Sequence, residues 1–300
     1  MPNQIEENLF VGTEVLLQEA LLHDRLELWF QPVYRTVDGK VMHNEVLLRM
    51  RDREGELIMP ALFIPVALRS GLMHQIDYRV LEKAIAQLAQ EPSLCLSVNL
   101  SSECLNDPGF ARNVKERLQV ANIQADRLCF ELSEQDVLKH FGAAQMLIKD
   151  LKGIGCRFAL DDFGFDISRC EYLRDLPVDM IKIDGKFIRG LKTDPLYRVL
   201  VSAMNDIAHA FGKRTLAESV EDTETLKILQ SLGVDYLQGY YLKRPTNITT
   251  STTRFKFPLR IMTFLVGLYV LKSALGIDLS EEHHIWELPV LLLRAVFPSL

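Results

Sequence analysis

Residues 26–50 read LELWFQPVYRTVDGKVMHNEVLLRM and contain two apolar, β-rich runs, Leu26–Tyr34 and Val41–Met50. The connection between them, residues 35–40, is too short for a crossover helix. Its Asp38-Gly39 pair is instead typical of a β-hairpin. We therefore predict that the first strand runs antiparallel to the second.

Six further runs with strand character follow, and segments long enough for a helix separate most of them. The runs are Leu94–Leu100, Leu128–Leu132, Arg157–Leu160, Met180–Ile183, Arg214–Ala217 and Tyr236–Leu242. The helical segments are Tyr78–Ala89, Ala111–Val120, Ala143–Leu151, Tyr197–Phe211 and Glu224–Leu232. Alternation of strands and helices favours parallel strands in a closed α/β barrel. The sequence thus predicts a modified (β/α)8, TIM-like barrel with an antiparallel first strand.

The composition fits a globular chain and excludes several classes of partner and cofactor. Hydrophobic residues make up 48% of the chain and charged residues 25%, which is enough for a sizeable core. The net charge of −6 provides no basic surface for a DNA or RNA duplex. The five cysteines are odd in number and never spaced as CxxC, so we expect free thiols rather than a disulfide or zinc framework.

A change in composition near residue 247 predicts a boundary between a barrel domain, residues 13–247, and an apolar helical tail, residues 254–300. Leu259–Ile277 approaches the length that spans a bilayer, although it contains Arg260 and Lys272. The basic residues before it suit a cytoplasmic barrel. Two alternatives stay open: the tail attaches the barrel to the cytoplasmic face of the inner membrane, or it packs on the barrel as a soluble helix.

Seven of the eight predicted strands end in acidic, amide or basic residues. Catalytic groups of such barrels lie at the carboxyl ends of the strands, so these side chains should meet at one rim. Clustered carboxylates need cations to stay ionised, and a donor set of oxygens favours Mg²⁺ or Mn²⁺ over zinc. Two such ions would suit in-line attack on a phosphodiester. The residues are Glu45, Arg49, Asn99, Glu131, Glu134, Asp161, Asp162, Lys182, Asp184, Glu218, Glu221 and Gln238.

These residues lie in motifs that resemble the EAL-domain family of cyclic-di-GMP-specific phosphodiesterases. Glu45-Val46-Leu47-Leu48-Arg49 is similar to the ExLxR signature of the family, with Val in place of Ala, and Gln31-Pro32 precedes it. The resemblance covers about residues 13–247. The remaining motifs follow in the family's order: Ser97-Val98-Asn99-Leu100-Ser101, Glu131-Leu132-Ser133-Glu134, Asp161-Asp162-Phe163-Gly164, Lys182-Ile183-Asp184, Ala217-Glu218-Ser219-Val220-Glu221 and Gln238-Gly239-Tyr240.

The resemblance implies hydrolysis of cyclic di-GMP to linear pGpG by a homodimeric enzyme that uses two Mg²⁺ or Mn²⁺ ions. It implies that Lys182 activates the water and that Glu221 and Gln238 support the site together with Glu45 and Glu218. Substrate contacts would come from Gln31, Arg49 and Asp184, and Glu134 would anchor the loop after the fifth predicted strand. The implied metal ligands are Glu45, Asn99, Glu131, Asp161, Asp162 and Glu218.

The loop Phe165–Arg169 departs from the family's pattern. Asp166 stands where the family has Gly, and Arg169 stands where it has Ser. Gly adopts positive φ freely, whereas Asp does so at a cost, so the loop can follow another path. This departure motivates a second hypothesis, in which the chain is a catalytically silent receptor or interaction module that binds cyclic di-GMP.

Overall fold

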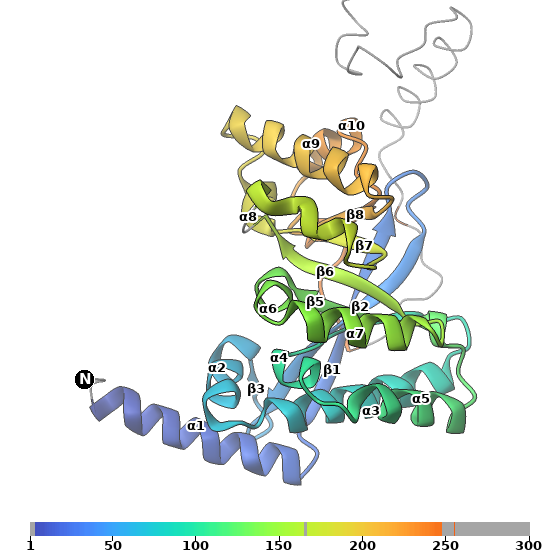
Figure 1. The fold of residues 1–300 in the computed structure, drawn as a ribbon. Coiled ribbons are helices and arrows are strands. Elements are labelled where there is room, and N and C mark those ends of the chain that lie inside the picture. The colour runs from blue at the N-terminus through green and yellow to red at the C-terminus, as the bar shows by residue number, and fades with distance from the viewer. Residues whose placement is uncertain (1–3, 165–166, 248–254, 256–300) are drawn as a thin grey trace, which may run out of the picture.

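The computed structural model describes residues 4–164, 167–247 and 255, and a closed barrel forms its centre (Figure 1). The barrel closes in the order β1-β2-β4-β5-β6-β7-β8-β9, with β9 pairing back to β1, while the short β3 pairs with the end of β2. The strands are β1 (Leu26–Arg35), β2 (Val41–Arg51), β3 (Leu57–Ile58), β4 (Leu96–Asn99), β5 (Leu128–Ser133), β6 (Arg157–Phe163), β7 (Met180–Ile183), β8 (Arg214–Ala217) and β9 (Tyr236–Leu237).

The first strand is antiparallel to both of its neighbours, β2 and β9, and the other barrel pairings are parallel. The hairpin between β1 and β2 turns at Gly39, whose φ of 66° is readily available to glycine. The Gly39 amide donates to the Arg35 carbonyl, and the Arg35 amide donates to the Lys40 carbonyl. The predicted modified barrel with an antiparallel first strand is therefore confirmed.

Helices surround the barrel and cover the outer face of its strands (Figure 1). An additional helix at the amino terminus, α1, packs against α2 and α3, and the sequence did not predict it. The helices are α1 (Gln4–Leu22), α2 (Pro60–Ser70), α3 (Met73–Gln90), α4 (Ser102–Leu105), α5 (Phe110–Val120), α6 (Glu134–Lys139), α7 (Phe141–Lys152), α8 (Gly185–Arg189), α9 (Pro195–Ala210) and α10 (Thr223–Ser231), with 3-10 turns η1 (Ala125–Arg127) and η2 (Ile167–Arg174).

The barrel interior has an apolar layer that is separate from the larger core between strands and helices. It consists of Val33, Cys129, Ala159, Met180 and Leu216, with Tyr236 packed against it. Two positions after five of these residues the chain carries a polar one: Glu131, Asp161 and Lys182 on their strands, and Glu218 and Gln238 directly after theirs. Because side chains two positions apart point to the same face of a strand, the polar residues lie directly above the apolar layer. All five cysteines are free thiols, as predicted.

Two predicted strands end three or more residues away from their observed ends. The strand predicted over Tyr236–Leu242 ends at Leu237, because the chain then turns against Val220. The Val220 amide donates to the Gln238 carbonyl, and a Cβ on Gly239 would lie 2.1 Å from the Val220 carbonyl oxygen. Only glycine permits this close approach. The strand predicted to end at Leu160 continues to Phe163.

The predictions for the tail, residues 254–300, lie outside the described residues except at Phe255. The Phe255 amide donates to the Gly39 carbonyl, and its ring packs on Tyr34 and Tyr241. Over the part of the chain that the structure describes, no helix combines the length and apolar character that crossing a bilayer requires. The boundary predicted near residue 247 stays a prediction.

Candidate active site

Lys182 lies at the centre of a group of carboxylates in the mouth of the barrel. It is the third residue of β7, and only 1% of its side chain is exposed. Its Nζ lies 2.5 Å from Glu131 Oε2, 2.8 Å from Glu218 Oε1, 3.1 Å from Asp161 Oδ2 and 3.4 Å from Glu45 Oε1. The strand ends therefore bring together four of the predicted acidic residues around one cation.

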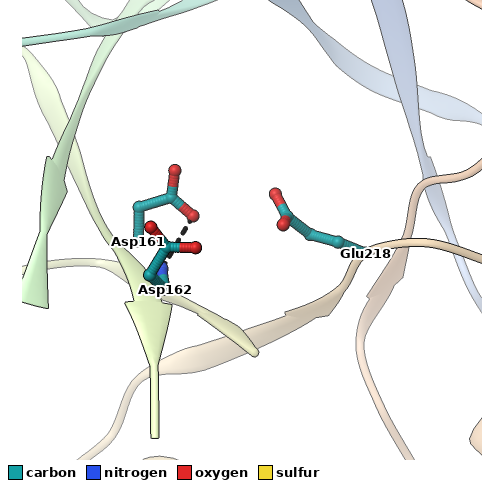
Figure 2. A group of neighbouring side chains, drawn as sticks. All are labelled: Asp161, Asp162 and Glu218. Atoms are coloured by element: carbon teal, nitrogen blue, oxygen red, sulfur yellow. Dashed lines mark hydrogen bonds between the residues drawn. The ribbon is translucent and has the colours of Figure 1, made fainter. Parts of the chain in front are cut away.

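The two adjacent aspartates of β6 both reach this mouth because the strand is irregular there. Residues alternate in direction along a regular strand, so Asp161 and Asp162 would otherwise point to opposite faces. The pairing with β7 shifts register between Leu160 and Phe163, and Asp162 has a φ of 55°. Such a bulge redirects a side chain at the edge of a sheet. Figure 2 shows both carboxylates near Glu218, which follows β8 across the mouth.

Glu45 is held by amide side chains from two other strands. Gln238 Nε2 donates to Glu45 Oε2 at 2.6 Å, and Asn99 Nδ2 donates to Glu45 Oε1 at 3.2 Å. Gln238 Nε2 also lies 3.3 Å from Gln31 Oε1, and Gln31 donates to the Lys243 carbonyl. This hydrogen-bonded chain restrains the carboxylate of Glu45, whose Oε1 also lies near Lys182 Nζ.

The acidic groups of the mouth differ in charge state. Burial, together with neighbouring carboxylates, raises the pKa of Glu131 to about 8 and that of Glu218 to about 7, even though Lys182 acts to lower both. Burial alone would also raise the pKa of Glu45, but Lys182 and the bonds from Gln238 and Asn99 lower it below its usual value. The site therefore carries more carboxylates than Lys182 alone can keep ionised.

The donor set suits divalent cations. Asp161, Asp162 and Glu218 each offer an oxygen, and these oxygens lie within 4.8 Å of one another. Glu131 Oε1 is buried and has no hydrogen-bond partner among the described residues. A buried carboxylate oxygen without a donor is costly unless a cation contacts it. Oxygen donors of this kind are the ligands that Mg²⁺ and Mn²⁺ prefer.

A cavity of about 380 Å³ opens beside these carboxylates. Five predicted residues line it, and so do Arg189 and Tyr240, which the sequence analysis did not assign to the site. Arg189 Nη1 donates to Ser219 Oγ at 2.9 Å. No periodicity or strand-end rule marks these two residues; for Tyr240 the only signal was its place beside Gln238 in a motif. The lining residues are Gln31, Glu45, Leu47, Arg189, Glu218, Ser219, Glu221, Gln238, Gly239 and Tyr240.

Two predicted substrate contacts are not among the described residues that line this cavity. The Arg49 guanidinium lies 5.6 Å from the centre of the Trp29 ring and donates to the Leu48 carbonyl. Asp184 accepts from the Lys186 amide at the start of α8 and pairs with the Lys186 ammonium at 2.8 Å. Both side chains thus already interact with other residues of the chain.

Glu134 connects the end of β6 with the segment beyond it. Ser133 caps α6, which places Glu134 in the first turn of that helix, completely buried. Glu134 Oε2 accepts from the Gly164 amide at 3.0 Å, and Oε1 accepts from the Tyr172 hydroxyl at 2.6 Å. Of the two departures from the family's pattern, Asp166 lies outside the described residues and Arg169 lies in η2.

Comparison with known proteins identifies the family. The family model described as EAL domain matches residues 15–245, so the chain belongs to the EAL domain family. The cyclic di-GMP phosphodiesterase PdeB of Shewanella oneidensis is 33% identical over 247 residues, which is 81% of this chain and 29% of the relative. The cyclic di-GMP phosphodiesterase PdeF of Escherichia coli is 35% identical over 233 residues, or 76% and 31%. The chain thus matches less than a third of the length of either relative.

Solved structures give the same result for the fold. The FimX EAL domain from Pseudomonas aeruginosa bound to c-di-GMP matches with a TM-score of 0.76 and 31% identity, over 82% of this chain and 99% of that one. The PaMucR phosphodiesterase in complex with c-di-GMP matches with a TM-score of 0.74 and 30% identity, over 78% and 97%.

Proposed function

We propose that this chain is a metal-dependent phosphodiesterase that hydrolyses cyclic di-GMP to linear pGpG. The observation that carries the proposal is the partly buried ring of Glu45, Glu131, Asp161 and Glu218 around the buried Lys182. Membership of the EAL domain family and relatives named cyclic di-GMP phosphodiesterases support the choice of substrate.

The chain's own residues would hold two Mg²⁺ or Mn²⁺ ions. Asp161, Asp162 and Glu218 are close enough to share a cation, and Glu131 has a free buried oxygen. When bound, such ions lower the pKa of a coordinated water and neutralise charge on a phosphodiester. The full proposed set of ligands is Glu45, Asn99, Glu131, Asp161, Asp162 and Glu218.

Lys182 acts in this proposal as a cation. Burial alone would lower its pKa, but the carboxylates of Asp161, Glu131, Glu218 and Glu45 raise it well above its usual value. A protonated ammonium can orient a water molecule and stabilise negative charge that develops on the phosphate, but it cannot accept a proton. Proton acceptance would then fall to a carboxylate of the mouth rather than to Lys182.

The cavity beside the carboxylates is the proposed place for the dinucleotide. Arg189 at its edge offers a guanidinium that matches phosphate oxygens, and the half-exposed ring of Tyr240 offers a surface for a base. Glu221 and Gln31 line the same cavity. Arg49 and Asp184 would contact substrate from outside this lining.

Incubation of the purified protein with cyclic di-GMP and Mg²⁺ or Mn²⁺, followed by separation of the nucleotides, tests the proposal. We expect pGpG to form only when a divalent cation is present. Formation of pGpG at the same rate after chelation would refute the metal-dependent mechanism. Glu45→Gln provides a matched control, because it keeps the shape of the side chain and removes its charge.

The second candidate function is a receptor that binds cyclic di-GMP without cleaving it. The departures Asp166 and Arg169 favour it, and one similar structure, the FimX EAL domain, is described as bound to c-di-GMP. Calorimetry and product analysis on one sample separate the two functions. Tight binding with intact dinucleotide after long incubation with metal supports the receptor. The homodimer, the cytoplasmic location and the membrane attachment of residues 254–300 stay predictions.

A further inference from the structure

A second cavity of about 260 Å³ lies at the other end of the barrel. Its lining comes from the beginnings of the parallel strands: Cys95 precedes β4, Arg157 opens β6, and Met180 opens β7. The apolar layer that contains Ala159 and Leu216 lies between this cavity and the ring around Lys182. The cavity is therefore distinct from the proposed active site.

The inner end of this cavity carries an unused hydrogen-bonding group. His43 lines it, is only 7% exposed, and its Nε2 is buried without a hydrogen-bond partner among the described residues. A neutral imidazole nitrogen donates or accepts according to its tautomer. A hydroxyl group can do either, and so it matches Nε2 in both tautomers.

The outer rim offers one guanidinium, that of Arg157, which makes no hydrogen bond within the part of the chain that the structure describes. Arg127 donates to the carbonyls of Leu88, Glu91 and Leu94, and Arg214 pairs with Asp235 at 2.8 Å. Arg157 is closest to Asp126 at 3.7 Å, which is too long for a hydrogen bond, and 42% of its side chain is exposed. Asp179 on the same rim is already paired with Lys152 at 2.5 Å. A carboxylate on a ligand would therefore meet Arg157.

The walls between these two polar ends are apolar. They include the thioether of Met180, the Cys129 thiol and the Tyr236 ring. Sulfur atoms and aromatic rings make favourable contacts with the edge or face of a flat ring. We propose that this cavity binds a small aromatic carboxylate with a hydroxyl group at the opposite end of its ring. This site does not depend on the proposed hydrolysis of cyclic di-GMP.

Three probes test the site: 4-hydroxybenzoate, benzoate, which lacks the hydroxyl, and 4-hydroxybenzamide, which lacks the charge. Titration into metal-free protein with labelled methionine methyl groups reports the location, since Met42 and Met180 line the cavity. We expect 4-hydroxybenzoate at millimolar concentration to shift these two signals. Benzoate should bind about fivefold more weakly, and the benzamide should bind about tenfold more weakly.

Two variants test which residue binds the carboxylate of the ligand and which binds its hydroxyl group. Arg157→Gln should weaken 4-hydroxybenzoate to the affinity of the benzamide and leave the benzamide unchanged. His43→Leu should remove the preference for 4-hydroxybenzoate over benzoate; if this variant does not fold, the comparison of the two ligands on the wild type still decides. Equal affinity for all three probes, or no shift of Met42 and Met180 with 4-hydroxybenzoate, would overturn the proposal. Displacement of the probe by cyclic di-GMP would also overturn it, because the probe would then occupy the other mouth.

Discussion

Gln238 donates a 2.6 Å hydrogen bond to Glu45 although 193 positions separate them in the chain. The bond forms because β1 lies between β2 and β9 in the closed barrel, so the ends of the first and last parallel strands come together across it. Both partners are buried. The barrel closure itself therefore determines the orientation of one proposed metal ligand.

Gln238→Leu should weaken metal binding more than it weakens the fold. The substitution leaves Glu45 Oε2 without its amide donor, and loss of a residue that orients a metal ligand costs about 10–100-fold in metal affinity or activity. Hydrolysis measured against Mn²⁺ concentration should shift to higher Mn²⁺ and recover in part at saturation. Gln230→Leu on α10 is the matched control, and it should leave the Mn²⁺ dependence unchanged. If hydrolysis by Gln238→Leu depends on the Mn²⁺ concentration as in the wild type, then Gln238 does not orient Glu45 for metal binding.

Lys182→Met should abolish hydrolysis and also destabilise the metal-free protein. Activity should fall by roughly 10²-fold or more, because the residue stabilises developing charge. Removing one partner of a buried ion pair costs about 3–5 kcal/mol, and here four carboxylates lose their cation. Mg²⁺ should therefore raise the melting temperature of the variant more than that of the wild type.

Lys192→Met is the control for this prediction. Lys192 pairs with Asp222 at 2.7 Å on the surface, where such pairs contribute little to stability. It should change neither activity nor the response to Mg²⁺. If Lys182→Met melts like wild type without metal, then the carboxylates are not ionised in the folded protein.

Much of the site could be predicted because strand periodicity fixes which side chains share a face. The apolar residue two positions before each polar one, as in Met180 and Lys182, places the polar residue at the carboxyl end of the barrel. The bulge at Asp161 could not be predicted, since nothing in the sequence shows that Asp162 adopts a φ of 55°. Aspartate tolerates that conformation without requiring it.

The residues that line the two cavities were harder to predict from the sequence. Arg189 ends the short helix α8, and its approach to Ser219 depends on how the barrel closes. Gly185 permits that approach, because a Cβ there would lie 2.4 Å from Ser219 Oγ. The unpartnered Nε2 of His43 arises from the packing of the barrel interior, which local patterns do not describe.

Glu134→Ala should lower activity by loosening the end of β6. Glu134 accepts from the Gly164 amide and the Tyr172 hydroxyl, and it is completely buried. Without Glu134, the Gly164 amide loses its acceptor. Gly164 lies two residues after Asp162, so this proposed metal ligand is held less firmly. We expect about a tenfold loss, as for other residues that orient ligands. Tyr172→Phe removes only one of the bonds described for Glu134 and should have a smaller effect; a larger loss in Tyr172→Phe would place the anchor elsewhere.

The metal-free protein should lose stability as pH rises from about 6.5 to 8.5. The folded-state pKa is raised to about 8 for Glu131 and about 7 for Glu218, whereas both lie near 4.5 when unfolded. In this range the folded state binds more protons than the unfolded state, so the free energy of unfolding falls with increasing pH. The pKa of His43 is lowered to about 4 and that of Asp77 is raised to about 6, so both groups titrate largely below this window.

Melting temperatures of chelated protein should decrease across it, and saturating Mg²⁺ should abolish the decrease, because a bound cation keeps the carboxylates ionised at no cost to folding. Glu131→Gln should flatten the slope without metal. If Glu131→Gln leaves the pH dependence of the melting temperature unchanged, other groups cause that dependence. The carboxylates around Lys182 would then be ionised even without a metal ion.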